Sequence, residues 1–584
     1  MPIIYGVSII ILFTLTILLK KTEEKLEIIK AVTINFVLLF AYNTFVCYIL
    51  NLINIPITLI ILSVINFAIS IPLIISIIKT KKIQEYTVSK TNIAVMILFI
   101  IITTIIININ FGNLTKIRYV SMDSREHYKA GREFSEITNL FKKTGPNITT
   151  HSGFMPGAYT NVGIIFKILN PYIGTVELYK AYIIFEAFVY LLIGIVFYML
   201  LEKYCKNINT KIIAIIFGII YVLGYPLNAW ISGFHYLMLG ILYVETILYI
   251  VKEREDINLD STLITTFLLN FGLILSYSLF CPFVYFAQFI YYIYKYKKHK
   301  NKIKLFLQTL VTLILPGIIG VTYLIVPSIG KVGGYIALEG WLYKNLWSNF
   351  IFFMPFTIYY IYTNIKNRKL EFDNIMFALL FIFILVLFIG TKTGKCSEYY
   401  FYKNYFIFWI LIIYSSTKGM IELLKENKTK FIVNIYTIIY LVIFAVAMYH
   451  NKTYVTSKRN DSLNTTMEIF TFNKTMIIAK EAEFMKQKEL ELLKEMENII
   501  EDNWQRENDI LLITNPNEER WIQSLTGYIN VLYDDKEYAI KNLEQENYKY
   551  IVTFESKITY ENMEQYIKKE NMKIIYQNQE RKNI

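Results

Sequence analysis

The sequence predicts an α-helical polytopic membrane protein with about 12–14 transmembrane helices and a small C-terminal α/β domain. Of its 584 residues, 55% are hydrophobic and only 18% are charged, whereas about a quarter of the residues are charged in a typical soluble domain. Apolar runs of roughly 18 residues or more recur from the first residue onward, and each is long enough to cross a hydrocarbon core as a helix. These observations exclude an ordinary soluble globular fold.

The expected spans follow the apolar runs between clusters of lysine. The first run ends in Lys20 and Lys21 without a small-residue cleavage site, so we expect a retained span and not a removed signal peptide. The four cysteines show no paired spacing, and we expect neither a disulfide framework nor a zinc site. The expected spans are 2–19, 31–50, 55–78, 92–110, 176–201, 212–228, 232–251, 261–277, 279–294, 304–326, 345–364, 374–390, 404–417 and 431–450.

Lysine and arginine indicate the topology, because they collect in cytoplasmic loops. The basic clusters lie in alternate loops, which places the N-terminus outside together with the loop 111–175 and the tail after about His450. The run 261–294 is basic at both ends, so we expect it to cross an even number of times with a turn near Tyr277. The net charge of +13 then belongs to cytoplasmic loops and requires no nucleic-acid partner.

The chain divides into a transmembrane domain, 1–450, and an exterior soluble domain, 451–584. In the tail we expect a leading helix over 475–502 and then strands alternating with helices, which is typical of a small parallel sheet. No glycine-rich loop follows the first strand, where the chain reads Thr514-Asn-Pro-Asn, so nucleotide binding is not expected. The expected strands are 509–514, 529–533, 548–554 and 572–576, and the expected helices between them are 517–526, 536–546 and 559–570.

The loop 111–175 carries the first candidate site. Asp123, Glu126 and His127 fall within about one turn of a polar helix expected to run to Lys143, so Asp123 shares a face with one of the other two. A carboxylate at the outer membrane surface can accept a proton from a hydroxyl or hold a divalent cation such as Mg²⁺ or Mn²⁺. The alternative is a charged juxtamembrane helix with Asp123 near its N-cap. The segment 158–169 is too short to span and is expected to lie in the interface or re-enter.

The short loop between the spans 374–390 and 404–417 carries the second candidate site. Its lysines oppose the positive-inside tendency, and a lipid-linked phosphate is the obvious anion to compensate for them. Neighbouring tyrosines are suited to stacking on sugar faces. The alternative is that snorkelling lysines and interfacial tyrosines anchor the chain among lipid head groups. The candidate phosphate ligands are Lys392, Lys395 and Lys403, and the candidate substrate-binding residues are Tyr399, Tyr400, Arg125 and His151.

Two acids, Glu186 and Glu245, lie inside expected spans. Ionisable groups within a membrane are costly and often functional. The alternative is that each one pairs with a lysine or a tyrosine within the helix bundle.

This arrangement resembles the GT-C superfamily of integral membrane glycosyltransferases. The resemblance rests on an acidic motif, Asp123 with Glu126, in the first large exterior loop, on the following His127-Tyr128, and on the many further spans and the exterior C-terminal domain. Members of this superfamily take a sugar from a polyprenyl phosphate or diphosphate and transfer it on the exterior face. Three additional helices precede the motif here, and its two acids are spaced more widely than in the usual pair.

The resemblance implies a glycosyltransferase that moves a sugar from a polyprenyl-phosphate donor to a cell-envelope acceptor, which is a glycan, a lipid or a protein. It implies that Asp123, Glu126 and His127 are catalytic and that the enzyme lies in the cell membrane. Richness in Ile, Lys and Asn indicates an AT-rich bacterial genome. Two alternatives stay open: a transporter or flippase for a lipid-linked glycan, and a polymerase or ligase of the O-antigen type.

Overall fold

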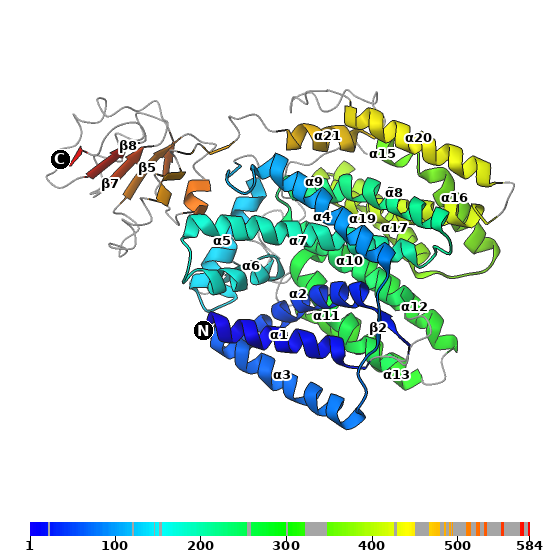
Figure 1. The fold of residues 1–584 in the computed structure, drawn as a ribbon, viewed down its shortest axis with the longest axis horizontal. Coiled ribbons are helices and arrows are strands. Elements are labelled where there is room, and N and C mark those ends of the chain that lie inside the picture. The colour runs from blue at the N-terminus through cyan, green and yellow to red at the C-terminus, as the bar shows by residue number, and fades with distance from the viewer. Residues whose placement is uncertain are drawn as a thin grey trace.

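The structure is a computed structural model in which helices form one large body and a small sheet lies to one side of it (Figure 1). The described residues are 1–20, 24–118, 122–144, 147–150, 155–253, 259–298, 302–321, 347–425, 429–449 and 467–478, with short pieces of 484–583.

Four apolar helices open the chain: α1 (Pro2–Leu18), α2 (Ile28–Leu52), α3 (Leu59–Thr80) and α4 (Lys90–Phe111). Three of them begin at side-chain caps, because Glu27, Thr58 and Ser89 each accept a hydrogen bond from a backbone N–H in the first turn. Helices α1 and α3 pack side by side (Figure 1).

The first large loop folds onto the bundle as two helices and a hairpin. Helix α5 (Met122–Glu136) leads to the antiparallel strands β3 (Phe141–Thr144) and β4 (Asn147–Thr150), and then to α6 (Pro156–Leu169). The polar helix expected to reach Lys143 therefore ends at Glu136. Helix α6 has 14 residues and is buried along most of its length, in agreement with a segment too short to span.

The remaining helices complete the bundle around α7, α10 and α19. They are α7 (Thr175–Glu202), α8 (Ile208–Leu223), α9 (Tyr225–Ile231), α10 (His235–Glu253), α11 (Leu259–Tyr277), α12 (Cys281–Lys298), α13 (Lys302–Thr309), α14 (Leu315–Gly320), α15 (Trp347–Phe350), α16 (Met354–Lys366), α17 (Phe372–Lys392), α18 (Glu398–Lys403), α19 (Tyr405–Leu423) and α20 (Lys430–Tyr449).

Ten helical runs in the described part of the chain are long and apolar enough to cross a membrane, which confirms the polytopic helical architecture. The expected spans 2–19 and 304–326 form shorter apolar helices, Pro2–Leu18 and Phe306–Gly320. The expected pair 261–277 and 279–294 appears as one run, Leu263–Tyr294. A 3-10 turn over Ser278–Phe280 interrupts that run at the position where a turn was predicted.

The tail contains the predicted sheet. Strands β5 (Ile510–Thr514), β6 (Val531–Tyr533), β7 (Tyr550–Thr553) and β8 (Lys573–Tyr576) are parallel, in the order β6-β5-β7-β8. A fifth strand, β9 (Lys582–Asn583), adds antiparallel to β8. A short helix, 521–525, lies within the predicted helix 517–526. The helices expected at 536–546 and 559–570, and most of the one expected at 475–502, fall outside the described residues.

Helix α21 (Glu468–Ile477) ties the tail to the bundle. The Asn473 amide donates to the backbone oxygens of Leu223 and Gly224, at 2.9 and 2.7 Å, and accepts from Asn228 at 3.1 Å. These contacts satisfy backbone oxygens at the break between α8 and α9. The sequence pattern predicts that this segment belongs to the exterior tail, and in the structure it packs against transmembrane helices.

A buried ion cluster joins the ends of α10, α17 and α19, and we call it the Lys252 ion cluster. Lys252 Nζ lies 2.5 Å from Asp373 Oδ1 and 2.8 Å from Glu371 Oε2. Lys418 Nζ lies 3.5 Å from Asp373 Oδ2, which also accepts a hydrogen bond from Tyr360 at 2.9 Å. Opposite charges compensate one another there, as burial requires.

Replacing Asp373 should destabilise the bundle. Asp373→Asn leaves two nearly inaccessible lysines, Lys252 and Lys418, without their shared carboxylate. We expect a loss of about 3–5 kcal/mol, the usual cost of breaking a buried ion pair. Thermal unfolding in detergent measures it, with Glu371→Gln as the control, because the Glu371 side chain is 25% exposed and should cost less. Equal losses for the two variants would contradict the central role of Asp373.

Candidate functional site

Four side chains from three separate elements meet at the start of α5, and we call them the Asp123 cluster: Asp123 from α5, Tyr236 from α10, and Tyr399 and Lys403 from α18. The Tyr236 hydroxyl donates to Asp123 Oδ2 at 3.4 Å, lies 3.1 Å from the Tyr399 hydroxyl and accepts from Lys403 Nζ. A phenol has one proton and two lone pairs. With the Tyr236 proton directed to Asp123, the Tyr399 hydroxyl must donate to Tyr236.

Aromatic rings enclose the Lys403 ammonium. Its nitrogen lies 4.1 Å from the ring centre of Tyr399, 4.3 Å from that of Tyr236 and 4.6 Å from that of Phe234. Ring faces attract a cation electrostatically, and more strongly where water is excluded. Lys403 is 1% exposed, so its charge acts on Asp123 and the rings and not on bulk solvent.

Burial and charge act in opposite directions on Asp123. Burial raises the pKa of the Asp123 carboxyl above its ordinary value, while Lys403 and the hydrogen bond from Tyr236 lower it. Burial is the larger effect, so the net pKa is raised. A carboxylate with a raised pKa is a better proton acceptor than an ordinary one.

His127 lies one turn beyond Asp123 and is fully buried. Its ring centre is 5.0 Å from that of Tyr236 and 5.8 Å from that of His235. Burial lowers the pKa of His127 well below its ordinary value, and His235 and Lys403 add to that effect. The imidazole is therefore neutral at physiological pH and packs against the Asp123 cluster.

Glu126 lies at the edge of the Asp123 cluster. Its side chain is 32% exposed, and its Oε1 lies 3.2 Å from Nε of the buried Arg125. The two neighbours thus form an ion pair beside Asp123. Because Glu126 raises the pKa of Asp123 and Arg125 lowers it, the pair adjusts the charge balance of the cluster.

A second polar network anchors the start of α5 to α7. The Ser124 hydroxyl donates to Glu186 Oε1 at 3.1 Å and lies 3.2 Å from the Tyr182 hydroxyl, which donates to the same oxygen at 2.5 Å. Glu186 therefore pairs with a tyrosine within the bundle, and Glu245 likewise accepts from Tyr221.

Gly233 allows α5 to approach the start of α10 closely. Its φ of +77° lies in the left-handed region, and a Cβ atom there would lie 2.5 Å from the backbone nitrogen of Ser124. Only glycine avoids both the steric cost of that conformation and the clash. The residue next to Asp123 in sequence is therefore positioned by backbone contact with the α9–α10 turn.

The tail holds α5 from both ends. Before the helix, the backbone nitrogen of Met485 donates to the oxygen of Ile117 at 2.9 Å. Within its last turns, Arg132 Nη1 donates to the backbone oxygen of Leu525 at 3.3 Å. The buried Trp521 packs edge-on against Tyr179 of α7, with ring centres 5.4 Å apart.

The structure brings together some of the predicted site residues and separates others. Asp123, Tyr399 and Lys403 meet in the Asp123 cluster, and the Tyr400 ring lies 5.3 Å from that of Tyr399. Lys392 and Lys395 are exposed, at the end of α17 and in the turn that follows it. No described interaction joins these two lysines to Asp123. His151 lies outside the described residues.

A divalent cation at Asp123 stays a prediction from the sequence. In the described ranges no group of three or more His, Cys, Asp and Glu side chains is arranged to hold a metal ion. Asp123 and Glu126 are the acids that would hold one, but the buried Lys403 already places a positive charge beside Asp123. These residues therefore fit a second cation poorly.

Two residues of the site could not be found from the sequence. Tyr236 is one of 47 tyrosines, and nothing in its neighbourhood marks it as the link between Asp123 and Lys403. Gly233 lies at the start of the expected span 232–251, where nothing distinguishes it from a glycine of an ordinary turn.

Similarity to known proteins is found among solved structures. No protein-family model matches the chain, and no curated protein matches it. Among solved structures the chain is similar to the oligosaccharyltransferase of Archaeoglobus fulgidus, crystallised with a tethered acceptor peptide containing the NVT sequon. The TM-score is 0.43 at 12% identity, over 74% of this chain and 63% of that chain.

Replacing Gly233 should disturb the site more than an equivalent change elsewhere. Gly233→Ala combines left-handed backbone strain with a clash against Ser124, whereas Gly394, at φ +71°, has nothing within 4 Å of its would-be Cβ. Gly394→Ala therefore measures the cost of the left-handed backbone conformation without a clash. We expect Gly233→Ala to cost about 1–3 kcal/mol more in thermal unfolding, the usual cost of overpacking. Equal costs would show that the start of α5 moves aside freely.

Proposed function

We propose that this protein is a GT-C-type membrane glycosyltransferase that moves a sugar from a polyprenyl-phosphate donor to a cell-envelope acceptor at the exterior membrane face. The observation that carries this proposal is the Asp123 cluster. It joins a carboxylate in the first large loop to a buried lysine about 280 residues later in the chain, at the same end of the helical bundle. The acceptor is a glycan, a lipid or a protein.

In the proposed reaction Asp123 accepts a proton. The acceptor hydroxyl oxygen forms a bond to the anomeric carbon of the sugar while the bond from that carbon to the donor phosphate oxygen breaks. The hydroxyl proton passes to the Asp123 carboxylate, and the phosphate leaves with the bonding electron pair. A free hydroxyl has a pKa far above neutral, so a positioned carboxylate accelerates its attack.

Lys403 has a different role from the one the sequence suggested. Its ammonium is enclosed by the rings of Phe234, Tyr236 and Tyr399 and donates to the Tyr236 hydroxyl, so a donor phosphate has no direct access to it. We assign Lys403 to keeping Asp123 ionised and the Tyr236 hydroxyl oriented. His127 and Tyr236, both buried against the same carboxylate, are positioning residues.

Lys392 and Lys395 remain the proposed ligands of the donor phosphate. Both are exposed and precede α18, which carries Tyr399 and Lys403 into the cluster. A leaving phosphate gains negative charge as its bond to the sugar breaks, and lysine stabilises that charge. We assign Tyr399 and Tyr400 to contact with the sugar between the phosphate and the carboxylate.

Loss of the Asp123 carboxylate should remove most of the transfer activity. We expect Asp123→Asn to lower the rate by about 10²–10⁴-fold, the usual contribution of a general base. The assay is transfer from a radiolabelled polyprenyl-phosphate sugar by purified protein in proteoliposomes. Glu133→Gln is the matched control, an isosteric change on the same helix that should leave the rate unchanged. Near-normal turnover by Asp123→Asn would remove the proposal.

The pH dependence of the transfer rate should follow the pKa of Asp123. The base must be ionised, so the rate rises with pH, and the raised pKa of Asp123 places this rise above the pH of about 4 expected for an ordinary aspartate. Lys403→Met removes a positive charge that lowers this pKa, so the rise should move to still higher pH.

The control for that shift is Lys395→Ala. It should raise the donor concentration needed for half-maximal rate and leave the pH profile in place. An unchanged profile in Lys403→Met would contradict the assigned role of Lys403.

A further inference from the structure

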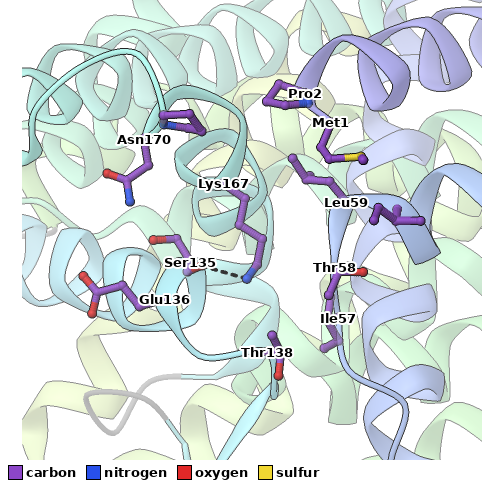
Figure 2. Close-up of a pocket in the computed structure, with 12 residues that line it drawn as sticks. Met1, Pro2, Ile57, Thr58, Leu59, Ser135, Glu136, Thr138, Lys167 and Asn170 are labelled. Atoms are coloured by element: carbon purple, nitrogen blue, oxygen red, sulfur yellow. Dashed lines mark hydrogen bonds between the residues drawn. The ribbon is translucent and has the colours of Figure 1, made fainter.

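A cavity of about 430 Å³ lies between the N-terminal helices and the first large loop. Its walls come from the first residues of α1, the start of α3 with the turn before it, and the ends of α5 and α6 (Figure 2). None of its lining residues belongs to the Asp123 cluster, so the transfer chemistry does not account for it.

One side of the cavity continues into apolar surface. Helix α3 has the length and hydropathy of a membrane span, yet only 22% of that span is buried inside the protein. Ile60, in the cavity wall, is 50% exposed, and Ile3 on the neighbouring α1 is 74% exposed. Such surface faces acyl chains when the helices lie in a bilayer. The cavity therefore opens at one end of a lipid-facing surface.

The other side of the cavity carries a cation. Lys167 Nζ donates to the backbone oxygen of Ser135 at 2.8 Å (Figure 2). It also lies 5.1 Å from the ring centre of Phe134. Burial lowers the pKa of Lys167 to about 8, with Glu136 opposing that shift, so most of the ammonium stays charged at pH 7. An ammonium has three donors, and in the described part of the chain only the bond to Ser135 engages this one.

Two further groups in the cavity wall interact with charged parts of a ligand: the N-terminus of α3 and the carboxylate of Glu136. The first turn of α3 begins at Leu59 in the cavity wall, and helix N-termini favour negative charge. Glu136 also lines the cavity, with Oε1 3.7 Å from Arg132 Nε and the side chain 49% exposed. A ligand with one negative and one positive group matches Lys167 and Glu136 together.

We propose that this cavity binds the head group of a zwitterionic membrane phospholipid. The phosphate lies at Lys167 and the start of α3, the head-group ammonium lies toward Glu136, and the acyl chains run along α1 and α3. A lipid with a net negative head group offers no cation to Glu136 and binds less well. In this proposal α1 and α3, which precede the acidic motif, form a lipid site together with α5 and α6.

The test uses the full chain in an uncharged maltoside detergent, titrated with phosphatidylethanolamine or phosphatidylglycerol. A ligand that binds the folded state raises the midpoint of thermal unfolding. We expect phosphatidylethanolamine to raise it saturably and more than phosphatidylglycerol does. Lys167→Ala should require at least about tenfold more phosphatidylethanolamine for half of the effect, as loss of a charge-assisted hydrogen bond predicts.

Three further variants make the result specific. Lys167→Arg keeps the charge and should retain most of the effect. Lys79→Ala removes an exposed lysine at the other end of α3 and should behave as the unmodified protein does. Glu136→Gln should bring the responses to the two lipids closer together, and it tests the proposal even if Lys167→Ala fails to fold.

Two outcomes would overturn the proposal. One is the same lipid response in Lys167→Ala, or in Glu136→Gln where Lys167→Ala does not fold, as in the unmodified protein. The other is equal stabilisation of the unmodified protein by both lipids. Neither readout needs turnover, so failure of the proposed transferase activity would leave this test unaffected.

Discussion

The interaction between Asp123 and Lys403 through the Tyr236 hydroxyl is the constraint on which the candidate site depends. A carboxylate and an ammonium removed from water are each costly, and together they are tolerated only when geometry and hydrogen bonds compensate. Here one phenol accepts from the ammonium and donates to the carboxylate. Three ring faces supply what water would otherwise give to Lys403. The buried charges therefore require α5, α10 and α18 to meet in one arrangement.

Helix α10 carries a second set of compensated charges at its other end, where the Lys252 ion cluster joins it to α17 and α19. Tyr236 and Lys252 lie on α10, 16 residues apart in sequence, which corresponds to roughly 24 Å along a helix. Lys403, at the end of α18, and Lys418, in the last turns of the following α19, are similarly 15 residues apart. The charged groups of the Lys252 ion cluster are enclosed and pair with one another, so the cluster stabilises the fold. With polar clusters at both ends, sliding α10 past α19 by one turn would break ionic contacts at each.

Much of the fold could be predicted from the sequence, because the constraint of the bilayer is local. An apolar run of the right length becomes a helix whatever surrounds it, and the spans around α2, α4, α7 and α17 were located within a few residues. The tail strands were found for a similar reason, since short β-branched runs between polar segments are a local pattern. Helix α21 was missed because its polar residues, such as Asn473, read as loop until they are seen bonded to backbone oxygens of α8 and α9.

The candidate site was predictable only in part. Its end members, Asp123 and Lys403, stood out because one is an acid in the first large loop and the other lies in a short loop whose lysines oppose the positive-inside tendency. The sequence could not distinguish Lys403 from Lys392 and Lys395, since burial depends on which rings surround each one. Tyr236 could not be predicted, because it links Asp123 to Lys403 only when three elements distant in sequence converge.

The contacts between the tail and α5 can form only after both segments have been synthesised. Asp123 leaves the ribosome about 400 residues before Leu525, whose backbone receives Arg132. At about 5–20 residues per second, that interval is roughly 20–80 s. During this period the first loop is already synthesised but has neither Lys403 beside its carboxylate nor the tail against its helix. The nascent chain thus carries α5 before the residues that complete its site, and the contact of Arg132 with the tail forms only after Leu525 has been synthesised.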